Sequence, residues 1–170
     1  MKFKKAIYSA DDVAKEVIRY SHEKDYDISN LKLQKILYFI QAIFLNESER
    51  ACFADDIEAW TLGPVIPYVY HKYKIFGANN IPLRACRNNN FSSIFAPSPI
   101  YKSQSELSYS DKNDIDLIVD FLSKYTATEL VNITHGQDPW IDAYAPHMNN
   151  IISKESIYMF FNKLTEIENG

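Results

Sequence analysis

The sequence predicts a mostly α-helical fold of the α+β class: a single compact helical domain over residues 1–170, with a small two- or three-stranded β element after the second helix. Three observations support this prediction. Apolar residues recur at helical spacing in most segments. A Ser, Thr or Asp stands where most of the periodic segments begin, as is typical of helix N-caps. In one short stretch, residues 57–62, the side chains of Ile57, Ala59 and Thr61 alternate with those of Glu58, Trp60 and Leu62, as the two faces of a short strand do.

The first two helices are marked by their starts. Ser9 and Asp12 form an S-x-x-D pattern that opens a helix over residues 10–23. The second and longest helix begins after Ser29 and fades near Asn46, and one broad apolar face of it must be buried. The opposite side carries a polar and aromatic stripe, which we expect to offer specific hydrogen bonds and contact area to a partner. This stripe consists of Gln34, Lys35, Tyr38 and Gln41.

The β element and its surroundings follow. The strand over residues 57–62 is expected to end in a turn at Gly63 and Pro64. A third helix over residues 66–76 then carries a cluster of aromatic residues. Residues 78–108 form a long Asn- and Ser-rich loop, of a length that is often functional. Within this loop, residues 99–102 could pair with the strand as a minor strand.

Four more helices are expected in the second half. Ser110 can cap the first of them, and a capping box from Thr126 to Glu129 starts the next, which stops at Gly136. Asp138 is placed as the N-cap of a short helix with proline at its first position. Ser153 caps the last helix, whose residues Ile157, Phe160, Phe161 and Leu164 are expected to face the core.

Composition narrows the class of protein. The chain is 46% hydrophobic and 24% charged, which is ordinary globular usage, and its 12 Tyr and 10 Phe favour a binding protein. The net charge of −4 disfavours a general binder of nucleic acid or of anionic membranes. The sequence shows no secretory signal and no apolar segment of membrane-spanning length, so we expect a soluble, cytoplasmic protein.

Patterns that carry chemistry are scarce. The four histidines match no metal-binding spacing, and no glycine-rich phosphate loop occurs, so we expect no metal and no cofactor. Cys52 and Cys86 lie outside any CxxC pattern and are interpreted as reduced, buried or half-buried thiols. The acidic run of Asp55, Asp56 and Glu58 is interpreted as a solvated strand edge rather than as a catalytic carboxylate pair.

One constellation of special residue types stands at helix ends and turns. These residues either lock the turns onto the core or shape a partner-binding surface, and the sequence leaves both interpretations open. The candidate partner-binding residues are Gln34, Lys35, Tyr38, Glu58, Trp60, Gly63, Pro64, Tyr70, Tyr73, His135 and Trp140.

Three blocks of this sequence resemble one known family. They are LKLQKILY at residues 31–38, IEAWTLGPV at residues 57–65 with the tyrosines after it, and Thr134-His135 followed by the Asp-Pro-Trp at residues 138–140. Their order and separations are similar to those of the Panacea domain, also called SocA-like and associated with phages. Each block alone is a weak signal, whereas the combination is specific.

The resemblance implies a helical fold with a small β element and a non-enzymatic antitoxin of a bacterial or prophage toxin–antitoxin system. Family members neutralise varied toxins by direct binding, and one type delivers its toxin to a protease. The expected partners are therefore a cognate toxin and, for an adaptor, a cellular protease, with neither membrane nor nucleic acid. We expect the bare domain, without the N-terminal DNA-binding domain of some relatives. The alternatives are a phage or prophage regulator that binds nucleic acid through residues 72–87, and an enzyme that uses His135 with Asp138.

Overall fold

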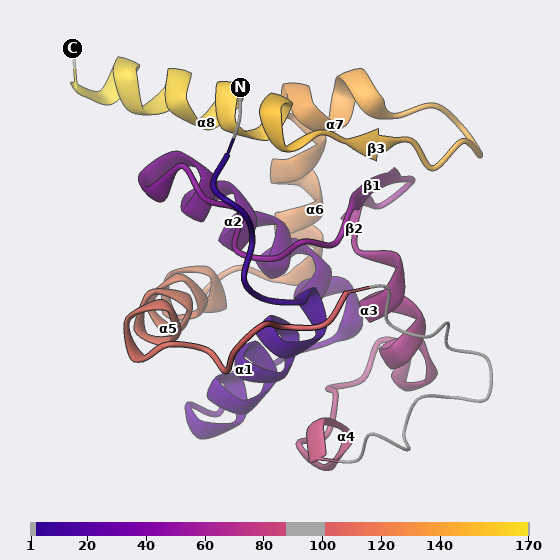
Figure 1. The fold of residues 1–170 in the computed structure, drawn as a ribbon. Helices are drawn as coiled ribbons and strands as arrows, with labels where there is room; N and C mark the ends of the chain where they lie inside the picture. Colours follow the sequence, from indigo (N-terminus) through magenta and orange to yellow (C-terminus); the bar gives the residue numbers. More distant parts are fainter. Residues whose placement is uncertain (1–2, 88–100, 170) are drawn as a thin grey trace.

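Helix α2 runs through the middle of the molecule, and the other helices and a small sheet surround it (Figure 1). The computed structural model describes residues 3–87 and 101–169. The fold is mostly α-helical with a small antiparallel sheet, as predicted. The elements are α1 (Ala10–Glu23), α2 (Asn30–Ser48), β1 (Ile57–Trp60), β2 (Gly63–Val65), α3 (Pro67–Tyr73), the 3₁₀ helix η1 (Lys74–Phe76), α4 (Arg84–Arg87), α5 (Tyr109–Ser123), α6 (Ala127–His135), α7 (Asp138–Ala143), β3 (Ile151–Ile152) and α8 (Lys154–Asn169).

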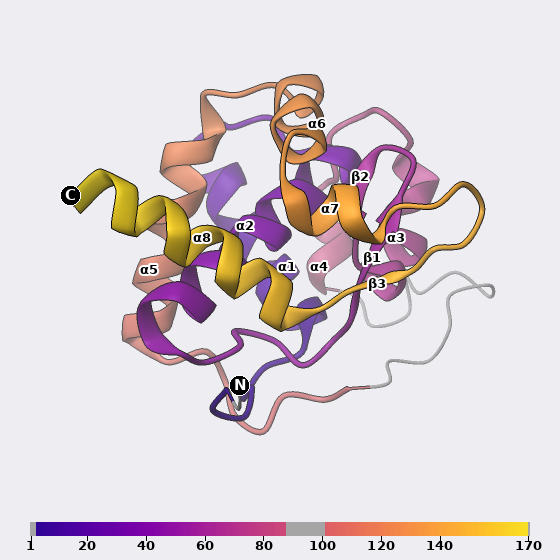
Figure 2. The ribbon, with the colours of Figure 1, turned by 90° about the horizontal axis from the view of Figure 1, so that it is seen from above.

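Helix α2 is buried on almost every side, because α1, α3, α5, α6, α8 and β2 all pack against it. Figure 2, seen from above, shows α8 lying across it. The expectation of an accessible polar stripe on α2 is therefore wrong: Gln34, Lys35, Tyr38 and Gln41 are all 0% exposed. Periodicity could not reveal this, because a helix covered on all sides can bury polar side chains wherever each finds a hydrogen-bond partner.

The sheet has the strand order β2-β1-β3, and both pairings are antiparallel. The hairpin turn lies at Thr61 and Leu62, so the prediction of a turn at Gly63 and Pro64 is wrong by two residues; these two belong to β2. The third strand comes from β3. Residues 99 and 100 of the predicted minor strand lie outside the described residues, as does much of the Asn-rich loop, and Tyr101 and Lys102 are not in a strand.

Most helix starts agree with the predicted caps. The Ser9 and Ser29 side chains accept hydrogen bonds from the backbone of α1 and α2, and the Thr126 capping box is formed. Two starts differ from prediction: Ser108 rather than Ser110 caps α5, and Gln137 rather than Asp138 is the N-cap residue of α7. The third helix covers the predicted span, with its last turn tightened into η1.

The last helix, α8, packs on α2 and α7. Ile157 is fully buried, and Phe161 makes edge-to-face ring contacts with Tyr38 and Phe39 of α2. Leu164 is exposed, so its predicted core position is wrong. Along the described residues, no helix combines the length and the apolar character that crossing a membrane requires.

Candidate partner-binding site

The polar side chains of α2 form hydrogen bonds that hold neighbouring backbone segments in place. Lys35 Nζ donates to the carbonyl oxygen of Pro64 at 2.9 Å, and Gln34 Oε1 accepts from the backbone N–H of Ile66 at the same distance. One turn further along, Tyr38 OH donates to Gln137 Oε1 at 2.8 Å. These bonds fix β2 and the junction between α6 and α7 against the central helix. All three side chains are fully buried and hold these backbone segments in place.

A close approach at Gly63 depends on the absence of a side chain. Its φ is +97°, and a Cβ there would lie 2.8 Å from Thr134 Oγ1 and 2.9 Å from Lys35 Cε. Both distances are shorter than carbon side-chain atoms tolerate, and the backbone conformation itself favours glycine. Gly63 is thus the point at which β2, α2 and α6 meet, and Pro64 beside it is also buried.

Lys35 is a buried cation whose hydrogen-bond acceptor is a neutral carbonyl group. Burial lowers the pKa of its ammonium group to about 7, because the charged form loses hydration that the Pro64 carbonyl only partly replaces. Near neutral pH this side chain therefore carries only part of a full charge.

A second set of amide side chains continues the network at the start of α2. Gln34 Nε2 donates to Asn30 Oδ1 at 3.0 Å, and Asn30 Nδ2 donates to the carbonyl oxygen of Tyr70 at 3.0 Å. The hairpin and α3 are in this way tied to the same end of α2. Asn30 and Gln137 were not predicted as site residues. Each stands next to residues of a family-like block, and a single amide side chain there gives no sequence signal of its hydrogen-bond partners.

The two tryptophans join the hairpin to α7. Trp60 Nε1 donates to Glu58 Oε2 at 2.7 Å, and its ring meets Tyr70 edge-on with centroids 4.9 Å apart. Trp140 Nε1 donates to the carbonyl oxygen of Trp60 at 2.9 Å. The Trp140 ring is stacked on His135, with centroids 4.1 Å apart. His135 and Trp140 therefore lock the far end of β1 to α6 and α7.

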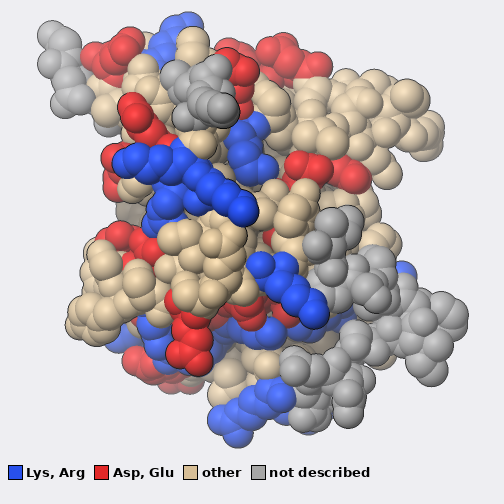
Figure 3. Space-filling view, viewed as in Figure 1, with Lys and Arg blue, Asp and Glu red and all other residues tan. Residues whose placement is uncertain are grey.

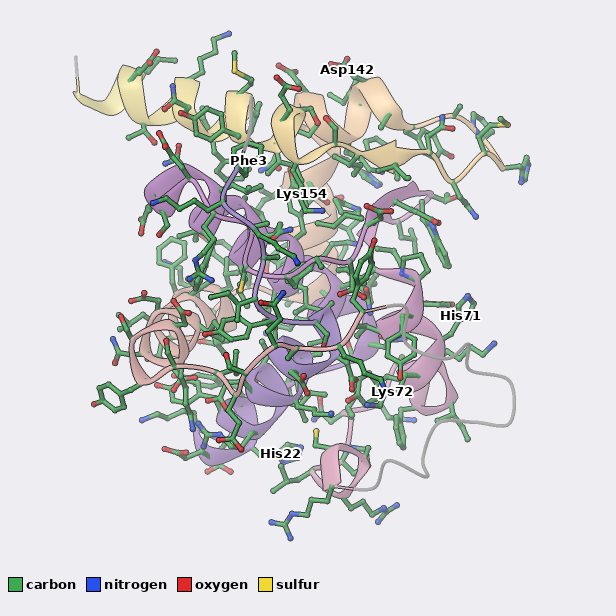
Figure 4. The ribbon with its side chains drawn as sticks, viewed as in Figure 1. Phe3, His22, His71, Lys72, Asp142 and Lys154 are labelled. Carbon is green, nitrogen blue, oxygen red and sulfur yellow. The ribbon has the colours of Figure 1, made fainter. Side chains whose placement is uncertain are left out.

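The two histidines near this site are shifted toward the neutral form. Burial lowers the pKa of His135, against an opposing hydrogen bond to the Thr61 backbone. His71, whose place on α3 is labelled in Figure 4, also has a lowered pKa, through burial first and then through the Lys74 charge. Among the described residues, no group of three or more His, Cys, Asp or Glu is placed to hold a metal ion.

A groove opens between the hairpin and α3, which we call the hairpin groove. Its volume is about 470 Å³. Leu62 at the hairpin tip is 53% exposed, and Trp60 and Tyr70 are half-buried in the walls. The lining residues are Asn30, Leu31, Gln34, Trp60, Thr61, Leu62, Val65, Tyr70, Lys74, Gly77, Ala78 and Asn149.

The structure thus divides the predicted residues into two groups. Trp60 and Tyr70 reach the hairpin groove, and Gln34 forms part of its floor. Tyr73, the last residue of α3, is buried and does not line this groove. The remaining predicted residues support the hairpin from inside or border it. Leu62 and Lys74 were not predicted, since single exposed residues carry no sequence signal.

The basic segment at residues 72–87 is less available than the sequence suggested. Lys72, labelled in Figure 4, is buried and pairs with Asp11 of α1, with Nζ 2.5 Å from the carboxylate oxygen. On the face seen in Figure 3, Lys and Arg are interspersed with Asp and Glu rather than gathered into one basic patch. Nucleic-acid binding through Lys72 is therefore not supported.

Comparison with known proteins identifies the family to which this chain belongs. The family described as "Antitoxin SocA-like, Panacea domain" matches residues 33–141, and the chain belongs to this family. Among curated proteins, Antitoxin SocA of Caulobacter vibrioides (strain NA1000 / CB15N) is 31% identical over 117 residues. The match covers 68% of this chain and 60% of that protein's length. No solved structure matches the chain.

Proposed function

We propose that this chain is the antitoxin of a bacterial or prophage toxin–antitoxin pair and that it neutralises its toxin by direct binding rather than by catalysis. Membership of the SocA-like family and the name of its curated relative support an antitoxin role. The match covers 60% of that relative's length. The proposed binding of a toxin is therefore argued only from the surface of this chain.

The observation that carries the proposal is the hairpin groove. Residues of the three family-like blocks hold β2 and the ends of α6 and α7 in place from inside, through Lys35, Tyr38 and Gly63. The hairpin turns Leu62 outward, beside the half-buried rings of Trp60 and Tyr70. A rigid backbone that presents aromatic and apolar side chains at a groove has the character of an interface hot spot.

The test is co-expression with the protein encoded beside this chain. Leu62→Asp places a charge in the hairpin groove without touching the buried network. We expect it to abolish protection of the cells and to weaken binding of the purified toxin by about 30-fold or more, the effect typical of a hot spot. The matched control is Met159→Asp, which places the same charge at an exposed apolar position of α8.

Circular dichroism melting of both variants separates lost binding from lost folding. Protection by Leu62→Asp equal to that of the parent would refute the hairpin groove as the toxin site. Failure of the parent chain to protect would refute the antitoxin function itself. The lifetime of the toxin in cells with and without the chain distinguishes sequestration, which leaves it unchanged, from delivery to a protease, which shortens it.

A further inference from the structure

A second groove lies on the other side of the molecule, and we call it the helix groove. Its walls are α5, α6 and α8 and its floor is α2, with a volume of about 480 Å³. Helix α5 and the hairpin with α3 lie on opposite sides of α2 in both Figure 1 and Figure 2. None of the residues that line the helix groove belongs to the hairpin groove.

The helix groove is apolar and open. On α5, Leu117 and Phe121 are 58% and 60% exposed. Because they are four residues apart, they are neighbours on the helix surface and form a continuous ridge. Ile133 of α6 and Phe161 of α8 lie in the same groove. Single exposed apolar side chains are common on protein surfaces. Several large ones gathered in one exposed groove indicate a site where another apolar surface binds.

The two ends of this groove differ in charge. Arg50, just after α2, pairs with Asp111 near the start of α5, while Lys32 near the start of α2 donates to the carbonyl oxygen of Ser123 at the end of α5. The two helices are therefore antiparallel, which brings Glu47 and Asp114 together at one end. Both carboxylates line the groove.

The acids at this end are available for a partner. Asp111 and Asp116 of α5 form ion pairs with arginines, whereas in residues 3–87 and 101–169 neither Glu47 nor Asp114 takes part in one. At the opposite end, the Lys124 ammonium group lies 4.1 Å from the centre of the Phe121 ring. The groove thus combines an apolar floor with an acidic end, and Lys124, which does not line the groove itself, lies beside its opposite end.

We propose that the helix groove is a second docking surface, which binds an amphipathic α-helix of a partner protein with its apolar face on the Leu117–Phe121 ridge and a Lys or Arg against Glu47 and Asp114. The span from Asp114 to Tyr125 corresponds to about three helical turns. A helix of this kind lying in an apolar groove is a common mode of peptide recognition. The partner is distinct from the one bound at the hairpin groove, because the two grooves face opposite ways.

The probes are two fluorescein-labelled, helical 18-residue peptides with the same leucine face, one flanked by lysines and the other by glutamates. Fluorescence anisotropy with the full chain should give at least tenfold tighter binding of the lysine peptide. Leu117→Asp should weaken that binding at least tenfold, and Leu62→Asp in the hairpin groove should leave it unchanged.

A pair of double variants tests the charge. Glu47→Lys with Asp114→Lys should reverse the preference toward the glutamate peptide. Asp138→Lys with Asp142→Lys makes the same change of net charge on α7, where Figure 4 labels Asp142, and should keep the preference for the lysine peptide. Since the protein is acidic overall, this control separates a local effect from general attraction.

Three results would overturn the proposal. They are equal affinity for the two peptides, a preference that both double variants lose alike, and full binding by a folded Leu117→Asp variant. Sedimentation equilibrium adds a fourth: a parent chain that is a dimer, and that Leu117→Asp converts to a monomer, would assign the groove to a second copy instead. None of these measurements involves the toxin, so their failure leaves the proposed antitoxin function standing.

Discussion

Replacing Gly63 by alanine should destabilise the fold by more than the backbone conformation alone explains. An alanine held at a φ of +97° costs about 1–3 kcal/mol. Its Cβ would also overlap Thr134 Oγ1 and Lys35 Cε, and relieving such overpacking in a buried site costs about 1–3 kcal/mol more. The total of about 2–6 kcal/mol is a large part of the stability of a typical domain.

The matched control for Gly63→Ala is Gly77→Ala. Gly77 also has a positive φ, of +55°, but a Cβ there would meet nothing within 4 Å. This control therefore carries the backbone cost without the overlap. Urea unfolding followed by circular dichroism gives both free energies of unfolding. A loss at Gly63 no larger than that at Gly77 would refute the close packing of β2 against α2 and α6.

Three further predictions concern buried polar groups. Because burial holds the folded pKa of Lys35 at about 7, below its usual 10.5, the unfolded chain binds more protons between these values. Stability should rise from pH 7 to pH 9, by on the order of 1 kcal/mol per unit, and Lys35→Met should remove this rise in urea titrations. Burial and a hydrogen bond to Glu16 raise the pKa of Asp116 to about 7. Its contribution to stability is therefore present at low pH and is lost as the pH rises from 4 to 7. Asp116→Asn should flatten the resulting decline in melting temperature over this pH range. Tyr38→Phe leaves Gln137 Oε1 without its donor and should cost about 1–3 kcal/mol in urea unfolding, while toxin binding by the folded variant stays unchanged; Tyr109→Phe, at an 88% exposed position, is the neutral control.

Local signals in the sequence were sufficient for most helices. The Ser9, Ser29 and Thr126 caps and the apolar spacing after them predicted α1, α2 and α6 closely. The β element was placed at the right position, but its turn was misplaced, because Gly63 looked like a turn residue. Position 63 requires glycine because α2 and α6 pack closely against it, and this is a contact between distant parts of the chain. Similarly, no local pattern could indicate that β3 supplies the third strand.

The sequence nominated residues for a partner-binding site but could not indicate the direction in which their side chains point. The sequence singled out Lys35 and Tyr38 as unusual, which is right, and placed them on the surface, which is wrong. A polar residue on a central helix is ambiguous, because hydrogen bonds to remote backbone groups satisfy it as well as water does. Leu62 was missed for the converse reason: its exposure depends on where the hairpin turns.

The burial of Lys35 and Thr134 and the close packing at Gly63 also bear on which positions of this fold can vary. Lys35, Gly63 and Thr134 all lie in the family-like blocks and form the frame of the hairpin, so substitutions among them threaten folding, although the same blocks also contain the exposed Leu62. Leu62 and Lys74, which face outward, contribute little to that frame and are free to be replaced. On the function proposed above, one scaffold can be adapted to new toxins by altering a few exposed positions of the hairpin groove while its buried frame stays constant.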